Sequence, residues 1–362
     1  MTQRTIRDSW IPAVSARNSR WADTARYPRS MAYWPFIILS LFLLCLSFPH
    51  AAPASAPNTI KVLIVNDLYP NLPSKQEKVE KLGSMQGELL VMGSRYEGNI
   101  DVWKGENGLY IINELPLEEY VRDVVAAEVN PEWDMEALKA QAVVSRTYAL
   151  HKKTANGDSL FHLASSVLHQ AYKGKNSDAR VAYAVSATTG EVLTFDGKVI
   201  EAFYHSTCGG RTEYPEEVFG KKCPYLTSVE STCDLSPYSA WERRIRLEEI
   251  GQALGFTDLR DVTINSYTST NRVKQLDLRT GSGTITVNAT DFRKALGWNR
   301  LPSTNFRLSL AGDEVVFQGS GYGHGVGLCQ WCMLRMAREG KKYTEILSYF
   351  YPGTKIQQYE ER

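Results

Sequence analysis

Glu128 is the acidic residue of this 362-residue chain whose neighbourhood best suits acid–base chemistry. It follows Val124 by four residues and Val125 by three, so in a helix it shares a stripe with these apolar side chains. A carboxylate among apolar neighbours loses hydration, which raises its pKa and keeps it protonated closer to neutral pH. A general acid needs this property, and the sequence therefore predicts Glu128 as a catalytic residue.

Two helices separated by Pro131 are predicted to position Glu128. The second begins after Asp134, a residue type that caps helices, and covers Met135–Leu150. Because this stretch is apolar on almost every side, we expect the second helix to be buried. Solvated positions are predicted for the charged residues in the first turns of the first helix, namely Glu118, Glu119, Arg122 and Asp123.

Three polar residues of the second helix, Gln141, Arg146 and Tyr148, are candidates for substrate contacts beside Glu128. Arg146 shares a face with apolar residues and therefore needs an acceptor or an anionic partner. The alternative for all three is packing inside the core, with Arg146 in a structural ion pair.

A predicted loop after the helices carries Gln170 and Tyr172, which are candidates for lining a sugar-binding groove. Trp133 and Tyr172 offer aromatic faces on which a sugar ring can pack. Surface aromatic residues are common without a ligand, so this interpretation remains a hypothesis.

Glycine occupies every second position from Gly321 to Gly327, which permits close backbone approach and unusual dihedral angles. The run lacks the Lys-Ser/Thr of a phosphate-binding loop, and this argues against nucleotide binding. His324 in this run and His205 are each candidates either for substrate binding or for hydrogen bonds within the fold. Ser206 is a further substrate-binding candidate, but no nucleophile-elbow pattern surrounds it, which disfavours a Ser–His hydrolase.

Six blocks of the sequence, in the family's order, resemble the SpoIID/LytB family of exported cell-wall proteins. The resemblance spans roughly residues 60–357 and implies that Glu128 is the catalytic glutamate. The blocks are LPLEEYVRDVVAAEV (115–129), EALKAQAVVSRTYAL (136–150), HQAYKG (169–174), AFYHSTCGGRTE (202–213), SPYSAW (236–241) and GYGHGVGLCQW (321–331).

A lone catalytic carboxylate suits one particular cleavage of glycan strands. Glycoside hydrolysis normally uses two carboxylates, and these blocks supply only Glu128. If the 6-hydroxyl of muramic acid attacks the anomeric carbon, one carboxylic acid protonates the leaving oxygen, then accepts the hydroxyl proton and leaves a 1,6-anhydro end.

The two branches of the family imply different functions. Resemblance to the sporulation branch implies lytic transglycosylation of peptidoglycan strands stripped of stem peptides. Resemblance to the LytB branch implies a non-enzymatic wall-binding protein that enhances an N-acetylmuramoyl-L-alanine amidase. The biological process stays open between spore development and general wall remodelling.

Five cysteines follow the N-terminal segment, and in an exported protein disulfides are the default. We predict a Cys208–Cys233 disulfide and no cofactor, although an odd count leaves at least one thiol free or metal-bound. The alternative is a zinc hydrolase built on His205, Cys208 and the Cys329–Cys332 pair. Some sporulation members carry zinc on cysteine and histidine, but the corresponding stretch here, residues 163–169, has no cysteine, so that site is not carried over.

Residues 1–52 are predicted to be a signal segment, with arginines ahead of the apolar run 33–48. This run is shorter than the roughly 20 residues of a spanning helix, which favours cleavage over a retained membrane anchor. Translation starts at Met1 or Met31, and we expect export to the periplasm or cell envelope. The segment contains six arginines and two aspartates, so the rest of a chain with net charge +1 is mildly acidic, which argues against nucleic-acid binding.

The predicted fold class is α+β, with an antiparallel β-rich body around a central buried helical pair that carries the active-site Glu. Asp196-Gly197 predicts a hairpin turn between two strands. The expected organisation is a linker at 53–59, a SpoIID-like catalytic region with a β-rich lead-in at 60–235, a β-rich inserted or second subdomain at 236–318, and the Gly-His-Gly loop with C-terminal helices completing the cleft at 319–362.

Overall fold

The computed structural model describes residues 58–64, 77–91, 93–106, 108–157, 159–166 and 169–359. These residues belong to one compact unit, Ala54–Arg362, and the description that follows concerns this unit. The predicted signal segment and most of the predicted linker lie outside the described residues. Within the described ranges, no helix has the length and apolar character needed to cross a bilayer.

A mostly antiparallel sheet forms the lead-in to the helical pair. Its last two-residue strand runs parallel to its neighbour, whereas the other pairings are antiparallel. In the described part of the chain, the strands in spatial order are β2 (Glu80–Val91), β3 (Ser94–Gly105), β4 (Gly108–Pro116), β1 (Thr59–Ile64) and β5 (Leu163–Ala164).

The helical pair consists of α2 (Leu117–Glu128), which follows β4 directly, and α3 (Met135–Asn156). As predicted, Asp134 caps α3, because its side chain accepts a hydrogen bond of 2.9 Å from the backbone N–H of Glu136. The inner turns of α3 are buried almost completely, so this helix lies at the centre of the core and neighbouring elements pack on it.

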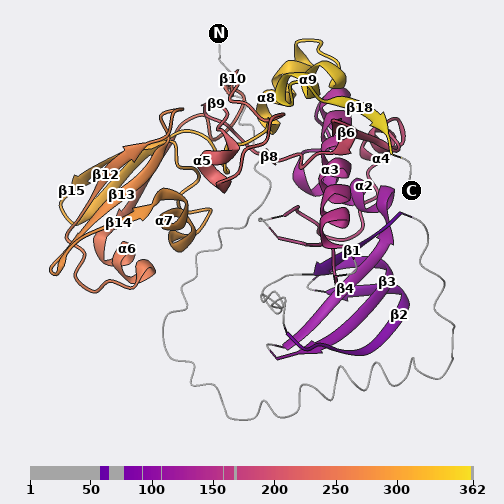
Figure 1. Ribbon diagram of the computed structural model, residues 1–362, viewed down its shortest axis with the longest axis horizontal. Helices are drawn as coiled ribbons and strands as arrows, with labels where there is room; N and C mark the ends of the chain where they lie inside the picture. Colours follow the sequence, from indigo (N-terminus) through magenta and orange to yellow (C-terminus); the bar gives the residue numbers. More distant parts are fainter. Residues whose placement is uncertain are drawn as a thin grey trace, which may run out of the picture. The chain divides into compact units, whose positions relative to one another are not determined.

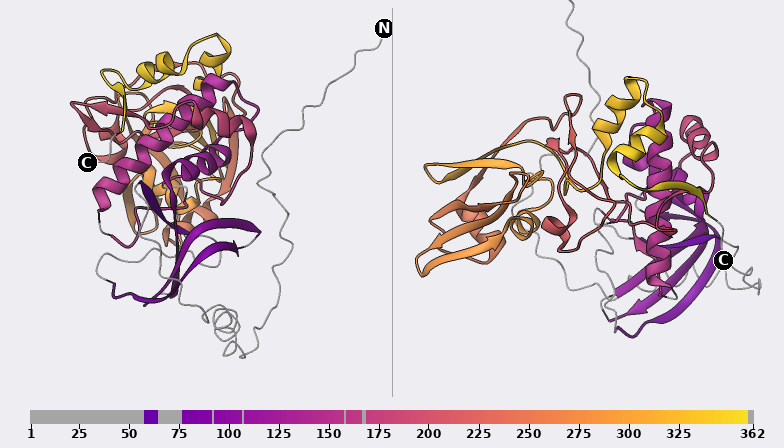
Figure 2. Two further views of the ribbon diagram at one scale, coloured as in Figure 1. Left: turned by 90° about the vertical axis from the view of Figure 1, so that its right-hand side faces the viewer. Right: turned by 45° about the horizontal axis from the view of Figure 1, so that its top comes forward.

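Helices α4 (Ala179–Ser186), α8 (Gln330–Arg338) and α9 (Tyr343–Phe350) also pack on α3. Figures 1 and 2 show α3 crossing the centre of this core, with strands β1 to β4 at one end and the yellow helices α8 and α9 at the other. This arrangement confirms the predicted α+β class with a buried central helix.

One of the four charged residues in α2, Asp123, is buried, contrary to the prediction, and Glu118 is only partly solvated because it pairs with a buried arginine. The carboxylate of Glu118 accepts two hydrogen bonds, of 2.8 and 2.6 Å, from the guanidinium of Arg146, which is 0% exposed. Asp123 is also buried and accepts a hydrogen bond of 2.9 Å from the backbone N–H of Asn176. Both partners lie far along the chain, so the local pattern could not reveal them.

A second set of strands lies on the other side of α3. Asp196 and Gly197 have positive φ angles of 50° and 72° and close the predicted hairpin. The second strand of this hairpin, predicted at 198–202, ends at Val199, and a separate strand begins at Tyr204. The elements are β6 (Glu191–Phe195), β7 (Lys198–Val199), β18 (Lys355–Gln358), which pairs with β6, and β8 (Tyr204–His205), which runs parallel to β17 (Leu328–Cys329).

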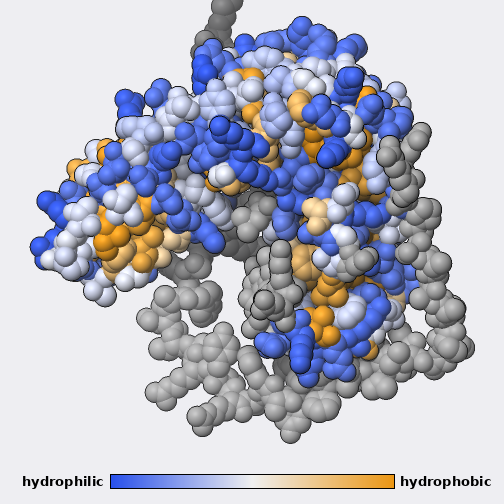
Figure 3. Space-filling view, in the orientation of Figure 1, coloured by the Kyte–Doolittle hydropathy of each residue, from blue (hydrophilic) through white to orange (hydrophobic). Residues whose placement is uncertain are grey.

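A separate hydrophobic core gathers residues between Trp241 and Phe317. Its strands form two antiparallel sheets, in the orders β11-β16-β15 and β12-β13-β14. In the view of Figure 3, apolar residues gather on the surface over these strands. The elements are β11 (Trp241–Arg246), α6 (Leu247–Leu254), β12 (Asp261–Tyr267), β13 (Val273–Thr280), β14 (Gly283–Asn288), α7 (Ala289–Leu296), β15 (Phe306–Ala311) and β16 (Glu314–Gly319).

Three short elements join the two cores: β9 (Gly210–Arg211), α5 (Pro215–Phe219) and β10 (Glu230–Ser231). Strands β9 and β10 pair with each other. The connection is held by the buried carboxylate of Glu213, which accepts hydrogen bonds of 2.7 and 2.5 Å from the hydroxyls of Thr268 and Thr270. These hydrogen bonds attach the segment that follows β8 to the loop between β12 and β13.

Glu118→Ala leaves the buried guanidinium of Arg146 without its carboxylate. Arg146 is buried but the Glu118 side chain is 36% exposed, so water can partly replace the lost carboxylate, and we expect the free energy of unfolding to fall by about 1 to 2 kcal/mol in denaturant titrations. Glu119→Ala, at the exposed neighbouring position, is the matched control and should change it by less than about 0.5 kcal/mol. Equal losses in the two variants would contradict the role given to Glu118.

Candidate functional site

The carboxyl group of Glu128, the last residue of α2, is held by three segments that are distant in sequence. Its Oε1 accepts hydrogen bonds from the backbone N–H of Ala171 at 2.6 Å and from the hydroxyl of Tyr204 at 2.9 Å. Its Oε2 lies 3.4 Å from the side-chain amide nitrogen of Gln330, the first residue of α8. One oxygen therefore has two strong donors and the other has one weak donor.

Burial raises the pKa of Glu128 above the ordinary value of 4.5, because the enclosed carboxyl group loses hydration when it ionises. The hydrogen bonds from Ala171, Tyr204 and Gln330 favour the charged form and offset part of this rise. The residue as a whole keeps some exposed surface. Glu128 thus has a raised pKa, as predicted from the apolar stripe of α2, in a residue that is not completely buried.

Two of the predicted substrate-binding residues, Gln170 and Gln141, act on Glu128 through one intervening group. The amide nitrogen of Gln170 lies 3.2 Å from the hydroxyl of Tyr204, which donates to Glu128. The amide oxygen of Gln141 accepts a hydrogen bond of 3.3 Å from Gln330, whose amide faces Glu128. Both glutamines are fully buried, so in this structure they orient the groups around Glu128.

His324 fixes the strand that presents Tyr204. Its Nε2 lies 2.9 Å from the carbonyl oxygen of Tyr204, and its Nδ1 accepts a hydrogen bond of 3.0 Å from the backbone N–H of Val326. These partners require the tautomer that carries its proton on Nε2. Burial lowers the pKa of His324 to about 4, so the ring is neutral at physiological pH with both nitrogens engaged.

The alternating glycines let the loop 321–327 lie directly on residues 203–208. All four glycines have positive φ, between 72° and 110°. A Cβ atom on Gly323 would lie 2.9 Å from the Cβ of His205, and one on Gly327 would overlap the carbonyl of Phe203. The glycine pattern is thus required by close backbone approach.

The side chain of His205 hydrogen-bonds with this loop, and that of Ser206 with the next residue, Thr207. His205 Nδ1 lies 3.1 Å from the carbonyl oxygen of Val326, and its buried Nε2 has no hydrogen-bond partner among the described residues. The hydroxyl of Ser206 lies 3.3 Å from that of Thr207, and Ser206 is partly exposed.

The remaining candidates are engaged within the fold. Besides Glu118, Arg146 donates to the carbonyl of Glu191 at 3.1 Å. Tyr148 is buried with its ring near Phe203. The sugar-stacking hypothesis fails for two aromatic rings, which are covered by protein: Tyr172 donates to Asn113 at 2.6 Å and contacts Tyr96 and Tyr120, and Trp133 packs edge-on against Trp331.

Two direct contacts of Glu128, Tyr204 and Gln330, were not predicted from the sequence. Tyr204 precedes His205, and Gln330 lies between two cysteines at the end of the glycine-rich block. Their presence in the family-like blocks was the available signal. Spacing alone does not show that they meet Glu128, because Gln330 lies 202 residues away along the chain.

The predicted Cys208–Cys233 disulfide is absent, and the five cysteines in the described part of the chain are free thiols. Cys208 and Cys233 do adjoin, with their sulfur atoms 3.0 Å apart, but Cys329 and Cys332 share the same space. The sequence could not reveal that two further thiols meet this pair. His205 is not a member of this group of sulfur atoms.

Comparisons with known proteins match two parts of the chain to families. Residues 105–195 match the family described as Stage II sporulation protein, and residues 238–327 match a domain of unknown function. The first match contains Glu128 and Ala171. Tyr204 and Gln330 lie outside it.

The chain is also similar to three proteins over most of its length. It is 33% identical over 275 residues to an uncharacterized protein of Brachyspira hyodysenteriae, covering 74% of this chain and 73% of that protein. It is 33% identical over 275 residues to Stage II sporulation protein D of Bacillus amyloliquefaciens, covering 71% and 78%. It is 27% identical over 290 residues to the Amidase enhancer of Bacillus subtilis, covering 66% and 40%.

Glu128→Gln tests the raised pKa through stability. A carboxyl whose pKa is higher in the folded than in the unfolded state adds stability at low pH, and this contribution is lost as the pH rises through the folded pKa. We expect the Tm of Glu128→Gln, relative to that of the wild type, to increase between about pH 4 and pH 8. Each unit by which the pKa is raised corresponds to about 1.4 kcal/mol.

Thermal unfolding of both proteins across this pH range measures the effect. Glu132→Gln removes an exposed carboxylate close to the same helix end and is the control, expected to follow the wild type. A Tm difference that is flat or decreases with pH would rule out a raised pKa at Glu128.

Proposed function

This chain belongs to the SpoIID family, and from that premise we propose that it is a peptidoglycan lytic transglycosylase with Glu128 as general acid and then base. The observation that carries the proposal is the enclosed carboxyl group of Glu128 with its raised pKa. Its hydrogen-bond partners in the described structure are a backbone amide, a phenol and a carboxamide, with no second carboxylate among them. The proposed reaction needs a single carboxyl group, and these partners position that group.

The asymmetric contacts of Glu128 assign different roles to its two oxygens. Oε1 accepts from Ala171 and Tyr204, and these donors stabilise negative charge on that atom. The proton therefore resides on Oε2, where the Gln330 amide is distant at 3.4 Å. Oε2 delivers this proton to the glycosidic oxygen as the bond to the anomeric carbon breaks.

The same carboxylate then accepts the proton of the muramic-acid 6-hydroxyl as that oxygen attacks the anomeric carbon. The sugar supplies its own nucleophile, so no water has to be activated on the opposite face. The product is a 1,6-anhydro end, and Glu128 returns to its protonated form. Glycan strands stripped of stem peptides are the substrates that we propose.

Export to the periplasm or cell envelope follows from this assignment, since the substrate lies outside the membrane. We place substrate contacts at the partly exposed Ser206 and beside the ring of His324, which border Tyr204. Zinc and other cofactors have no part in the proposed step, because the proton transfers are complete with Glu128 and the sugar hydroxyl.

A non-enzymatic enhancer of a wall amidase is the second candidate. The similarity to the Amidase enhancer favours it, although this chain covers 40% of that protein's length. In this case the surface around Glu128 would bind the wall without cleaving it. The two candidates differ in whether purified protein alone produces anhydro-ended fragments.

Incubation with denuded glycan strands, followed by mass spectrometry of the products, distinguishes the candidates. We expect wild-type protein to release 1,6-anhydro fragments, which are lighter by one water than the hydrolysis products. Glu128→Gln should reduce the rate at least about 100-fold, the scale of a lost general acid. Glu132→Gln should retain the wild-type rate. Intact strands after incubation with wild-type protein that sediments with cell walls would overturn the enzyme and support the enhancer.

Tyr204→Phe tests the donor to Glu128 Oε1. The Tyr204 hydroxyl lowers the pKa of Glu128 by favouring its charged form, so removing the hydroxyl should raise that pKa further. The basic limb of the pH–rate profile, where the acid loses its proton, should therefore move to higher pH. Tyr183→Phe, at an exposed position, should leave the profile unchanged. A basic limb that moves to lower pH in Tyr204→Phe would contradict this role.

A further inference from the structure

Four cysteine side chains from distant segments meet at one buried point. Cys208 follows β8, Cys233 follows β10, Cys329 ends β17 and Cys332 lies in α8. Their sulfur atoms all lie within 4.8 Å of one another, including 3.0 Å between Cys208 and Cys233, 3.4 Å between Cys233 and Cys329, and 3.6 Å between Cys208 and Cys332. We call this group the thiol tetrad.

The spacing of the thiol tetrad fits four ligands around one metal ion. Zinc binds thiolates at ~2.3 Å in a tetrahedron, which puts the sulfur atoms about 3.8 Å apart. Three of the separations, 3.0, 3.4 and 3.6 Å, lie slightly below this value, and no two of the four sulfur atoms are more than 4.8 Å apart. In a cluster of several iron ions the cysteine sulfur atoms bind different irons. They would then lie farther apart than the sulfur atoms of this site. The geometry therefore favours a single ion.

The surroundings of the thiol tetrad suit a negatively charged group. The backbone N–H of Cys208 donates to the sulfur of Cys329 at 3.1 Å, and the backbone N–H of Gly209 donates to the sulfur of Cys233. Amide donors of this kind stabilise metal-bound thiolates. In the described structure these two N–H groups are the backbone donors to the sulfur atoms of Cys329 and Cys233.

A buried cation next to the thiol tetrad supplies an independent observation. Arg272 is 2% exposed, and its Nη2 donates to the carbonyls of Cys208 and Arg211. Its Nη1 is buried and has no hydrogen-bond partner in the described part of the chain. The carboxylate of Glu213 is 4.0 Å from its Nε and is already engaged by threonine hydroxyls. Four thiolates with one zinc ion carry a net charge of −2, which would compensate this guanidinium.

We propose that Cys208, Cys233, Cys329 and Cys332 bind one structural zinc ion. Binding replaces the four thiol protons, so Zn²⁺ and four thiols give a tetrathiolate complex and release four protons to solvent. All four ligand positions are filled by protein, as in structural rather than catalytic zinc sites. The site is therefore separate from the chemistry proposed for Glu128.

The zinc ion would fix both direct side-chain contacts of Glu128. Cys208 lies four residues after Tyr204, and Cys329 and Cys332 flank Gln330. Coordination thus anchors β8 and the start of α8 to each other at the position where their side chains reach Glu128. The ion positions these residues without touching the substrate.

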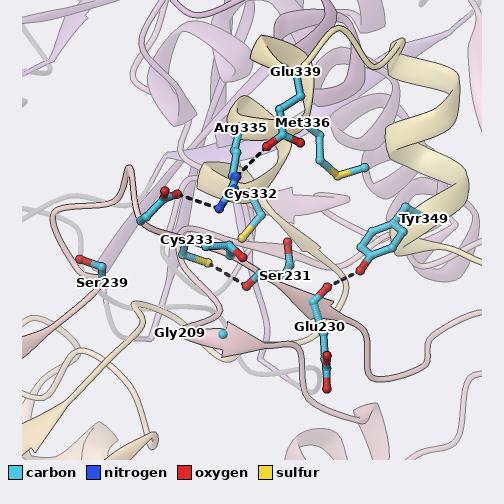
Figure 4. Close-up of a pocket in the computed structure, with 13 residues that line it drawn as sticks. Gly209, Glu230, Ser231, Cys233, Ser239, Cys332, Arg335, Met336, Glu339 and Tyr349 are labelled. Atoms are coloured by element: carbon cyan, nitrogen blue, oxygen red, sulfur yellow. Dashed lines mark hydrogen bonds and ion pairs between the residues drawn. The ribbon is translucent and has the colours of Figure 1, made fainter.

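An opening to the thiol tetrad is present in the structure. Cys233 and Cys332 line a cavity of about 620 Å³ together with Arg335 and Tyr349. Figure 4 shows the sulfur atoms of both cysteines at this cavity, with the Arg335 guanidinium directed to carboxylates on either side. Metal ions and chelators can therefore approach the tetrad from this face.

Two disulfides within the thiol tetrad are the competing chemistry for an exported protein. Each would require an external oxidant to remove two electrons and two protons from a thiol pair. The full chain would then weigh less than the reduced protein by four hydrogens, and alkylation after denaturation without a reductant would leave all four cysteines unmodified. Zinc-bound thiolates would instead all be alkylated under these conditions.

Metal content of the purified full chain tests the proposal. We expect about one zinc per chain by plasma mass spectrometry, and at least a tenfold lower content in Cys233→Ser and in Cys332→Ser. Cys223→Ser is the matched control, since this buried cysteine lies outside the tetrad, and should retain the wild-type zinc. Zinc-free wild-type protein with two disulfides, or one iron per chain in place of zinc, would overturn the assignment.

Cobalt reconstitution of the wild-type chain decides the ligand set even if the serine variants do not fold. Co²⁺ should give the intense ligand-field bands of a tetrahedral site and the near-ultraviolet charge-transfer bands of thiolate ligands, and added zinc should abolish both. Weak octahedral bands without thiolate charge transfer would overturn the proposal. Neither measurement uses a glycan substrate, so their outcome is independent of the proposed enzymatic activity.

Discussion

Opposing forces act on the carboxyl group of Glu128. Burial at the end of α2 disfavours its charged form, while the amide of Ala171 and the hydroxyl of Tyr204 favour it. The proposed general acid loses and regains a proton, and it needs both effects because either alone would fix one protonation state. The other parts of this core serve to keep these donors in place around a helix end.

This balance depends on distant segments that converge on Glu128. Helix α3 is buried along its inner turns and supplies Gln141, which orients Gln330. The glycine-rich loop brings His324 against the carbonyl of Tyr204 because its glycines allow direct contact with the strand beneath. Neutral His324, engaged at both nitrogens, acts as a fixed part of the scaffold rather than as a second acid or base.

Much of the architecture could be predicted because local rules decide it. The apolar stripe around Val124 and Val125, the cap at Asp134 and the turn at Asp196-Gly197 are set by residues within a few positions. The same periodicity placed Glu128 among apolar side chains, as found. These features depend on helix and turn geometry rather than on long-range contacts.

Features that depend on long-range partners could not be predicted. The local pattern predicts a fully solvated Glu118, because its partner, Arg146, lies on another helix. Tyr172 was a candidate for sugar stacking because an aromatic residue has the same sequence appearance in a core as on a surface. The cysteines suggested a disulfide because the convergence of four sulfur atoms cannot be deduced from their spacing along the chain.

The most direct test of this account is the titration of the Glu128 carboxyl carbon by NMR, assigned by its disappearance in Glu128→Gln. The account predicts a titration midpoint above 4.5, the ordinary value for glutamate. A midpoint at or below that value would show that the hydrogen bonds outweigh burial, and a general acid protonated near neutral pH would then be excluded.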